Sequence, residues 1–191
     1  MNRGGIRITR IFGITIRVDW SWLIILALVT WNLSRVFGQA RPDRSPASTW
    51  ALSLGAALLF FLSVLIHELA HSLVARSRGI RVEDITLFIF GGVSDIEERP
   101  DTPGGEFLMA VLGPVTSFVI SLILLFLCGA AGYPGAVLGD PEGTLAQLTL
   151  RTTLFVWLGS IDVVLGVFNM IPVFPLDAGW VPRVAGLSVV A

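Results

Sequence analysis

Long uncharged hydrophobic runs, separated by polar segments, dominate the pattern of this chain. Runs of this kind predict membrane-spanning helices, because about 20 apolar residues cross the hydrocarbon core of a bilayer. The connections are rich in glycine, proline and charge, which favour turns and loops. The pattern therefore predicts an all-α polytopic membrane protein with about four transmembrane helices, at residues 20–33, 50–75, 107–128 and 148–171.

Two shorter segments have patterns typical of β-structure. Isoleucines and a valine recur between Ile6 and Val18, which indicates a short β-hairpin or an interfacial lead-in. The segment "ITLFIFGGVS" after the second span is too short to cross a bilayer as a helix and is rich in β-favouring residues. It is either an ordinary hairpin or, over Ile85–Phe90, an edge strand beside a cavity, able to pair with an extended peptide. A small hairpin or sheet is therefore expected near the site described below.

Composition and charge agree with a membrane protein. The 191 residues are 54% hydrophobic and 14% charged, with a mean hydropathy of +0.80, whereas soluble domains carry about 25% charged residues. A net charge of −1 gives no basic surface for nucleic acid. The single cysteine, Cys128, excludes an internal disulfide and a cysteine zinc cluster, and is expected to be a buried small hydrophobe. Without repeats or low-complexity linkers, residues 1–191 are expected to form one membrane domain.

Arginine supplies all the basic residues and predicts the orientation. With the N-terminus inside, the inner segments hold nine arginines and the outer segments four. The positive-inside rule therefore predicts a multi-pass protein of the cell membrane with a cytoplasmic N-terminus. The first apolar run begins only after Asp19, and no small-residue cleavage site precedes it, so the first span is expected to remain as an anchor rather than to be a signal peptide.

The candidate chemistry lies in the second span, in "FLSVLIHELAHSLVARS". A charged carboxylate near the middle of a bilayer costs roughly 2.5–3.5 kcal/mol, so a functional reason is expected. On a helix His67 and His71 lie on one face, about 6 Å apart along the axis. Both could bind one zinc ion, with Glu68 beside them as general base for the metal-bound water. The alternative is a hydrogen-bonded His/Glu cluster that joins helices.

A zinc hydrolase needs a third protein ligand, and the chain has no histidine besides His67 and His71. Two acids are candidates. Asp177 follows the last span in "NMIPVFPLDAG", where two prolines break the helix and imply a protein-lined site. Asp162 lies inside the last span, and three roles stay open for it. It could contact a metal ligand without binding the metal, form a hydrogen bond between helices, or be a protonated acid. A structural role is favoured for Asp162.

Together these motifs resemble the site-2 protease family of intramembrane zinc metalloproteases, peptidase family M50. The H-E-x-x-H motif lies in a membrane span, a span with Gly-Pro follows, and N-x-x-P-x-x-P-L-D-x-G closes the pattern. The segments "GGIRITRIFGITIRVDWSWLI" and "GGVSDIEERPDTPGGEFLMAVLGPVTS" are similar to the bacterial and archaeal branch that often carries CBS domains. The resemblance implies a metalloendopeptidase that cleaves transmembrane helices of membrane proteins. It also implies one Zn²⁺ per chain held by His67, His71 and Asp177, with Glu68 as catalytic base and Asn169 lining the site.

The sequence departs from this family's pattern after Asp177. The family usually reads L-D-G-G-R, whereas this chain reads "LDAGWVPRVAGLSVVA", and CBS domains are absent, so the C-terminus is expected to be truncated or altered. The rival interpretation is therefore a catalytically inactive metal-binding or interaction protein. A metal transporter is less favoured, because transport sites usually leave polar residues along several spans. The expected partners are the lipid bilayer and a transmembrane protein substrate, with no nucleic acid, and a homodimer stays open.

Overall fold

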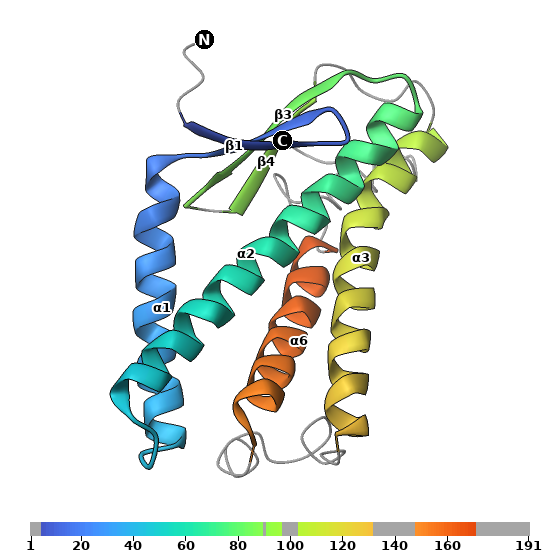
Figure 1. Ribbon diagram of the computed structural model, residues 1–191. Coiled ribbons are helices and arrows are strands. Elements are labelled where there is room, and N and C mark those ends of the chain that lie inside the picture. Colours follow the sequence, from blue (N-terminus) through green and yellow to red (C-terminus); the bar gives the residue numbers. More distant parts are fainter. Residues whose placement is uncertain (1–4, 90, 97–102, 132–147, 171–191) are drawn as a thin grey trace, which may run out of the picture.

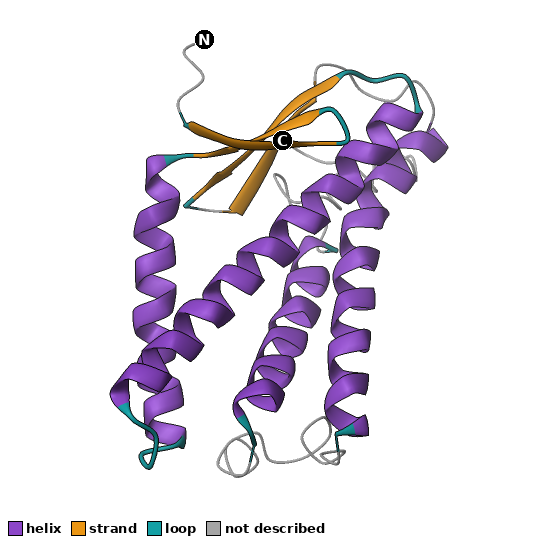
Figure 2. Ribbon diagram, viewed as in Figure 1, coloured by secondary structure: helices purple, strands orange, loops and turns teal. Residues whose placement is uncertain are grey.

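The computed structural model describes residues 5–89, 91–96, 103–131 and 148–170, and places a small sheet at one end of a group of long helices (Figures 1 and 2). The described elements, in chain order, are β1 (Ile6–Ile11), β2 (Ile14–Val18), α1 (Trp20–Ala40), α2 (Pro46–Ser77), β3 (Val82–Phe88), β4 (Gly91–Ile96), α3 (Pro103–Ala130) and α6 (Leu150–Asn169).

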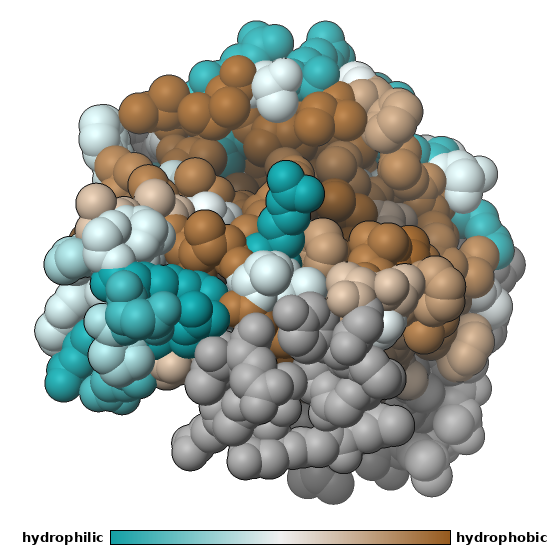
Figure 3. Space-filling view, turned by 60° about the horizontal axis from the view of Figure 1, so that its bottom comes forward, coloured by the Kyte–Doolittle hydropathy of each residue, from teal (hydrophilic) through white to brown (hydrophobic). Residues whose placement is uncertain are grey.

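In the described part of the chain, four helices are long and apolar enough to cross a membrane. The most hydrophobic 18-residue stretch of each helix has a mean hydropathy of 1.4 in α1, 2.2 in α2, 2.5 in α3 and 1.5 in α6. Hydrophobic side chains cover much of the helical surface that faces the viewer in Figure 3, and large ones such as Leu122 and Phe126 are about 70% exposed. Exposed apolar surface of this extent suits contact with lipid tails. The predicted fold class, four apolar helices with a small sheet, is confirmed.

Local sequence signals set the ends of the first two helices. The side chain of Asp19 accepts a hydrogen bond from the Ser21 amide and caps α1. Ser45 caps α2 in the same way through the Ser48 amide, and Pro46 occupies the first turn, where its missing N–H costs nothing. After α2, Gly79 turns the chain with a φ of 83°, a conformation that glycine adopts without strain.

The sheet has the strand order β1-β2-β3-β4. The hairpins β1–β2 and β3–β4 are antiparallel, and β2 pairs with β3 in parallel, so the N-terminal hairpin joins a strand that follows two long helices. The prediction of a hairpin before the first span is thus confirmed. Of the two alternatives for "ITLFIFGGVS", the hairpin is confirmed. The edge strand over Ile85–Phe90 is wrong, because β3 is paired on both sides and the edges of the sheet are β1 and β4.

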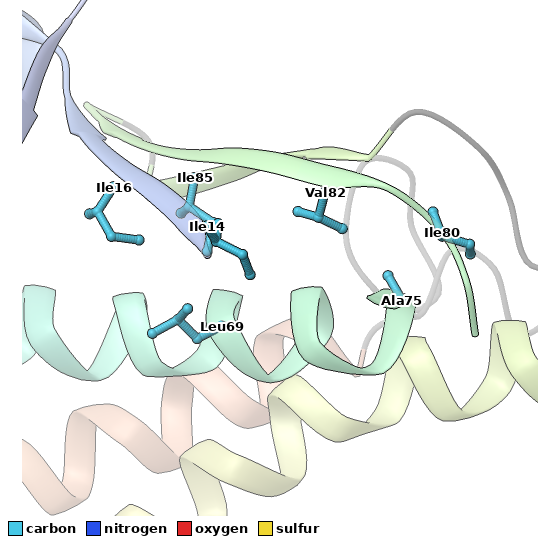
Figure 4. Close-up of a cluster of buried hydrophobic side chains, with 7 residues drawn as sticks. All are labelled: Ile14, Ile16, Leu69, Ala75, Ile80, Val82 and Ile85. Atoms are coloured by element: carbon cyan, nitrogen blue, oxygen red, sulfur yellow. The ribbon is translucent and has the colours of Figure 1, made fainter. Parts of the chain in front are cut away.

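A hydrophobic cluster fixes the sheet to the C-terminal half of α2 (Figure 4). Alternation along β2 turns its isoleucines toward the helix, β3 adds side chains beside them, and α2 supplies the opposing side chains. The buried members are Ile14, Ile16, Leu69, Ala75, Ile80, Val82 and Ile85. Since Leu69 lies between the two histidines in sequence, this cluster also fixes the position of the H-E-x-x-H turn under the sheet.

Small residues allow the helices to approach one another closely. An added Cβ at Gly159 of α6 would lie 2.9 Å from the Leu125 side chain of α3, and one at Gly166 would lie 2.9 Å from Phe118. Close contact of this kind replaces the hydrophobic driving force that is absent between helices in lipid. Helix α2 runs obliquely past α6 and α3 (Figure 1) and contacts both of them. Its two histidines therefore face α3 rather than lipid.

Candidate metal centre and active site

The two histidines of α2 come together on one face of the helix, as the sequence predicts. His67 is 2% exposed and His71 is 6% exposed. Their Nε2 atoms lie 3.2 Å apart, and the ring centroids are separated by 4.9 Å. Burying two imidazoles in an apolar helix is costly unless their nitrogens have partners, so the contacts of each ring decide what the pair can do.

Both rings are oriented through their Nδ1 atoms by helix α3. His67 Nδ1 lies 2.9 Å from Ser117 Oγ, and His71 Nδ1 lies 2.5 Å from the carbonyl oxygen of Met109. A carbonyl can only accept, so Nδ1 of His71 carries the hydrogen and donates it. The Nε2 atom of that ring then presents a lone pair. A hydrogen bond through one ring nitrogen is characteristic of histidines that bind a metal through the other nitrogen.

A glycine in α3 faces the two Nε2 atoms. A Cβ added to Gly113 would lie 2.0 Å from Nε2 of His71 and 2.7 Å from Nε2 of His67. Any other residue would therefore fill the space that the two nitrogens face. Pro114 follows inside the helix and cannot donate a hydrogen bond to the preceding turn. The Gly-Pro pair thus lies directly at the histidines.

The spacing of the imidazole nitrogens fits zinc. Two nitrogens each bonded to a tetrahedral zinc ion at about 2.0–2.1 Å lie about 3.3–3.4 Å apart, and the observed separation is 3.2 Å. A zinc ion bound by two histidines therefore suits these rings as they stand. In the part of the chain that the structure describes, no group of three or more His, Cys, Asp or Glu side chains is arranged for a metal. The predicted third ligand, Asp177, lies outside the described residues.

The carboxylate of Glu68 is positioned by the edge strand. Ser94 of β4 donates a hydrogen bond to Glu68 Oε2 at 3.0 Å, and Ser72 of α2 donates to Ser94 at 3.1 Å. A Cβ at Gly92 would approach Glu68 Cγ to 2.5 Å, so this glycine lets β4 pass directly over the acid. The predicted general base is therefore linked to β4 by packing and by a hydrogen bond.

A cavity of about 500 Å³ opens beside the histidine pair. It is bounded by α1, α2, the β3–β4 hairpin and the end of α6, and its wall is largely apolar. Among the described residues of its wall, the polar side chains are those of His67, Glu68 and Asn169. Asn169 thus lies at the cavity that Glu68 and His67 share, and its Nδ2 donates to the Leu165 carbonyl at 3.0 Å.

Asp162 lies away from that cavity wall and serves a helix contact. Its side chain is fully buried, and Oδ1 accepts a hydrogen bond from Ser63 of α2 at 2.7 Å. Its Oδ2 is buried without a hydrogen-bond partner among the described residues. The sequence left three roles open for Asp162. The hydrogen bond to Ser63 supports one of them, a contact between helices α2 and α6.

Four residues at the site escaped the sequence analysis as functional positions. Ser117 and Met109 hold the histidines, Ser94 holds Glu68, and Gly92 makes room for it. Gly113 was noted only as part of a Gly-Pro pair. Serine and glycine are common in membrane helices and hairpins. Only the position of these residues opposite the H-E-x-x-H face therefore identifies them as part of the site.

Comparison with known proteins agrees with this geometry. The model of peptidase family M50 matches residues 55–137, which include the H-E-x-x-H motif and the Gly-Pro pair. A protein of Synechocystis sp., sll0528, named as a candidate zinc metalloprotease, is 40% identical over 174 residues, 91% of this chain and 42% of the relative. The chain matches this family over the segment that carries the motif. Its relatives also include zinc metalloprotease MJ0392 of Methanocaldococcus jannaschii, 31% identical over 93% of this chain and 44% of that protein.

A solved member of the family has the same arrangement of helices and strands. The site-2 protease from Methanocaldococcus jannaschii superposes with a TM-score of 0.63 at 29% identity, over 95% of this chain and 71% of that chain. The chain spans less than half the length of the curated relatives named above. The comparisons thus support a site-2 protease fold, and a likeness to peptidase family M50 for the segment that carries the H-E-x-x-H motif.

Proposed function

We propose that this M50 chain is an intramembrane zinc metalloendopeptidase that cleaves transmembrane helices of membrane proteins. The observation that carries the proposal is the histidine pair, whose Nε2 atoms face the space left by Gly113 at a separation that suits zinc. His67, His71 and Asp177 would hold the metal. The bound ion would supply Lewis acidity, polarising a carbonyl group and acidifying water.

The residues of the chain perform the proton transfers. Glu68 lines the cavity beside His67 and is aimed by Ser94, so it can accept a proton from an attacking water and pass it to the leaving amine. The amide of Asn169 shares the cavity wall and is suited to contact the scissile backbone. The apolar remainder of the wall fits the side chains of a transmembrane segment and limits the access of other water molecules.

The edge strand β4 offers a way to hold the substrate. A peptide bond inside a helix is shielded, so the substrate has to unwind before its carbonyl can be attacked. An extended segment can add to β4 through main-chain hydrogen bonds. Gly91, Gly92 and Val93 of this strand line the cavity that contains Glu68. A segment paired with β4 would thus lie beside the base.

The proposal also covers the orientation of the chain in the membrane and its branch of the family. The N-terminal strands, the C-terminal end of α2 and the β3–β4 hairpin lie at one end of the helices (Figure 1). The described arginines of the predicted inner side belong to this end: Arg7, Arg10, Arg17, Arg76, Arg78 and Arg81. We place this end in the cytoplasm, because the positive-inside rule favours it. The N-terminal motifs favour the branch of the family in which CBS domains are common. The family relatives named as zinc metalloproteases favour catalysis over an inactive metal-binding role.

Cleavage of a model transmembrane substrate by the purified chain tests the proposal. We expect cleavage that is lost in Glu68→Gln and on treatment with a zinc chelator, and that returns when zinc is added back. Glu106→Gln is the matched control, because Glu106 lies in the first turn of α3 and its change is chemically identical. Near-normal cleavage by Glu68→Gln would exclude the mechanism. A zinc-loaded wild type without cleavage would favour the inactive metal-binding alternative.

A further inference from the structure

Five arginines converge on a hollow of about 650 Å³ at the sheet end of the molecule, away from the histidine pair. They come from both strands of the N-terminal hairpin, from the last turn of α2 and from the turn that leads to β3. The five are Arg7, Arg10, Arg17, Arg76 and Arg81. Among the described residues of the lining, the carboxylates are those of Glu83 and Asp84, so arginines outnumber acids there in a chain whose net charge is −1.

Strand register explains why these charges gather. Arg7 lies opposite Arg17, and Arg10 lies opposite Thr15, so their side chains share one face of the β1–β2 hairpin. The intervening Ile14 and Ile16 are buried against α2 on the other face. The hydrophobic cluster that fixes the sheet thus directs the arginines away from the helices.

Hydrogen bonds hold three of these guanidinium groups in place. Arg17 Nε donates to Asp84 at 3.1 Å, and Arg10 Nε donates to the carbonyl oxygen of Gly13 at 3.0 Å. Arg76 Nη1 donates to the carbonyl oxygen of Phe12, across the same tight turn. Gly13 has a φ of 80°, and a Cβ there would lie 3.1 Å from Arg76 Nη1, so glycine at this position lets the guanidinium lie over the turn.

Such an arrangement favours the binding of an anion. Like charges that share one hollow repel each other, and among the described lining residues two carboxylates face five guanidinium groups. Each guanidinium that uses one N–H on a backbone carbonyl keeps other N–H groups for a ligand. Planar forks of this kind match the oxygen atoms of a phosphate group and bind it bidentately.

We propose that this hollow, which we call the arginine hollow, is a binding site for a phosphate-bearing anion. The ligand is the phosphate of an anionic lipid headgroup or a soluble phosphate compound, and the two share the same chemistry. The arginine hollow is separate from the proposed catalytic cavity and shares no lining residue with it. Arg76 follows His71 on α2 after little more than one turn, so a ligand would tie the β1–β2 turn to the helix that carries the histidines.

Two binding measurements on the detergent-purified full chain test this site. The soluble arm measures the affinity for inorganic pyrophosphate by calorimetry. The lipid arm measures retention of phosphatidylglycerol against phosphatidylcholine by native mass spectrometry, from equimolar mixed micelles. The test variant is R10Q/R76Q. The matched control is R35Q/R151Q, which removes the same charge from two exposed arginines on α1 and α6, outside the hollow.

We expect the wild type to bind at least one probe, and R10Q/R76Q to lose about tenfold or more in affinity or in lipid selectivity, since hydrogen bonds to charged groups contribute strongly. The control variant should bind like the wild type. Because R10Q/R76Q also removes two contacts to the turn, R7Q/R81Q is measured in parallel and should show a comparable loss. Circular dichroism checks that each variant keeps its helix content.

The pattern of binding decides the source of the phosphate. Pyrophosphate binding alone assigns a soluble phosphate compound, and phosphatidylglycerol retention alone assigns a lipid headgroup. Binding of neither probe by the wild type would overturn the proposal. An equal loss in R35Q/R151Q would also overturn it, because the effect would then follow the overall charge rather than the hollow.

Discussion

Replacing Gly113 with alanine tests the geometry of the histidine pair directly. The new Cβ would lie 2.0 Å from His71 Nε2, whereas ordinary contacts of a Cβ begin at 3.4 Å. The ring or the helix therefore has to move by about 1.4 Å. Zinc–ligand distances in proteins stay within about 0.2 Å of their ideal values, so this displacement is several times larger than coordination tolerates.

The expected result is loss of metal with retention of fold. Gly113 lies inside α3, and its φ is outside the left-handed range, so alanine is compatible with the backbone. In a helix interior alanine is favoured over glycine by about 1 kcal/mol. We therefore expect Gly113→Ala to keep its helix content and to bind zinc at least about 100-fold more weakly than the wild type, beyond the range found for changes behind metal ligands.

Zinc titration with a competing chelator measures this change, and the same helix supplies the control. An added Cβ at Gly129 of α3 meets nothing within 4 Å, so Gly129→Ala should bind zinc as the wild type does. If Gly113→Ala kept wild-type zinc affinity, the two Nε2 atoms would not be the metal-binding atoms. Equal losses in both variants would instead indicate a general effect on α3.

Further predictions follow from the rest of the site. Ser94→Ala removes the hydrogen bond to the proposed base, so kcat should fall by about tenfold or more while zinc content is kept; an unchanged kcat would deny Ser94 a positioning role. Asp177→Asn should weaken zinc binding and abolish cleavage, whereas Asp162→Asn should keep both, and the reverse outcome would make Asp162 the ligand. Reporters fused after Asp101 should be cytoplasmic and those fused near Asp140 external, and the opposite pattern would invert the orientation.

Hydropathy predicted where the helices cross a membrane but not where they end. The first span was predicted to end at residue 33, whereas α1 continues to Ala40. The added residues include Ser34, Arg35 and Gln39, whose polarity ends the apolar run without ending the helix. Hydropathy reports contact with lipid, and backbone hydrogen bonding continues past the hydrocarbon boundary. At α2 a local signal existed, since Ser45 followed by Pro46 is typical of a helix start.

The sheet was predictable only as separate hairpins. Alternation along residues 6–18 is a local signal, and it gave the β1–β2 hairpin. The parallel pairing of β2 with β3 joins segments on either side of α1 and α2, and no local pattern encodes a contact of that separation. This pairing covers one edge of β3 and leaves β4 as the edge strand at the cavity, which is why the edge-strand alternative for Ile85–Phe90 fails whereas the hairpin alternative holds.

The pairing of His67 with His71 was predictable because helix periodicity alone brings the two residues to one face. The residues that orient and accommodate them come from other elements. Ser117 and Gly113 lie on α3, far along the chain from the motif, and each is a residue type found throughout the sequence. Their roles depend on how α2 crosses α3, and packing of that kind is visible only in three dimensions.

The zinc content of purified protein tests the central claim most directly. We predict about one zinc ion per chain in the wild type, measured by inductively coupled plasma mass spectrometry against protein concentration. His67→Ala and His71→Ala should each lose most of this zinc, because each removes one of the two nitrogens that face each other at 3.2 Å. Full zinc occupancy in both variants would contradict the assignment of these histidines as the metal centre.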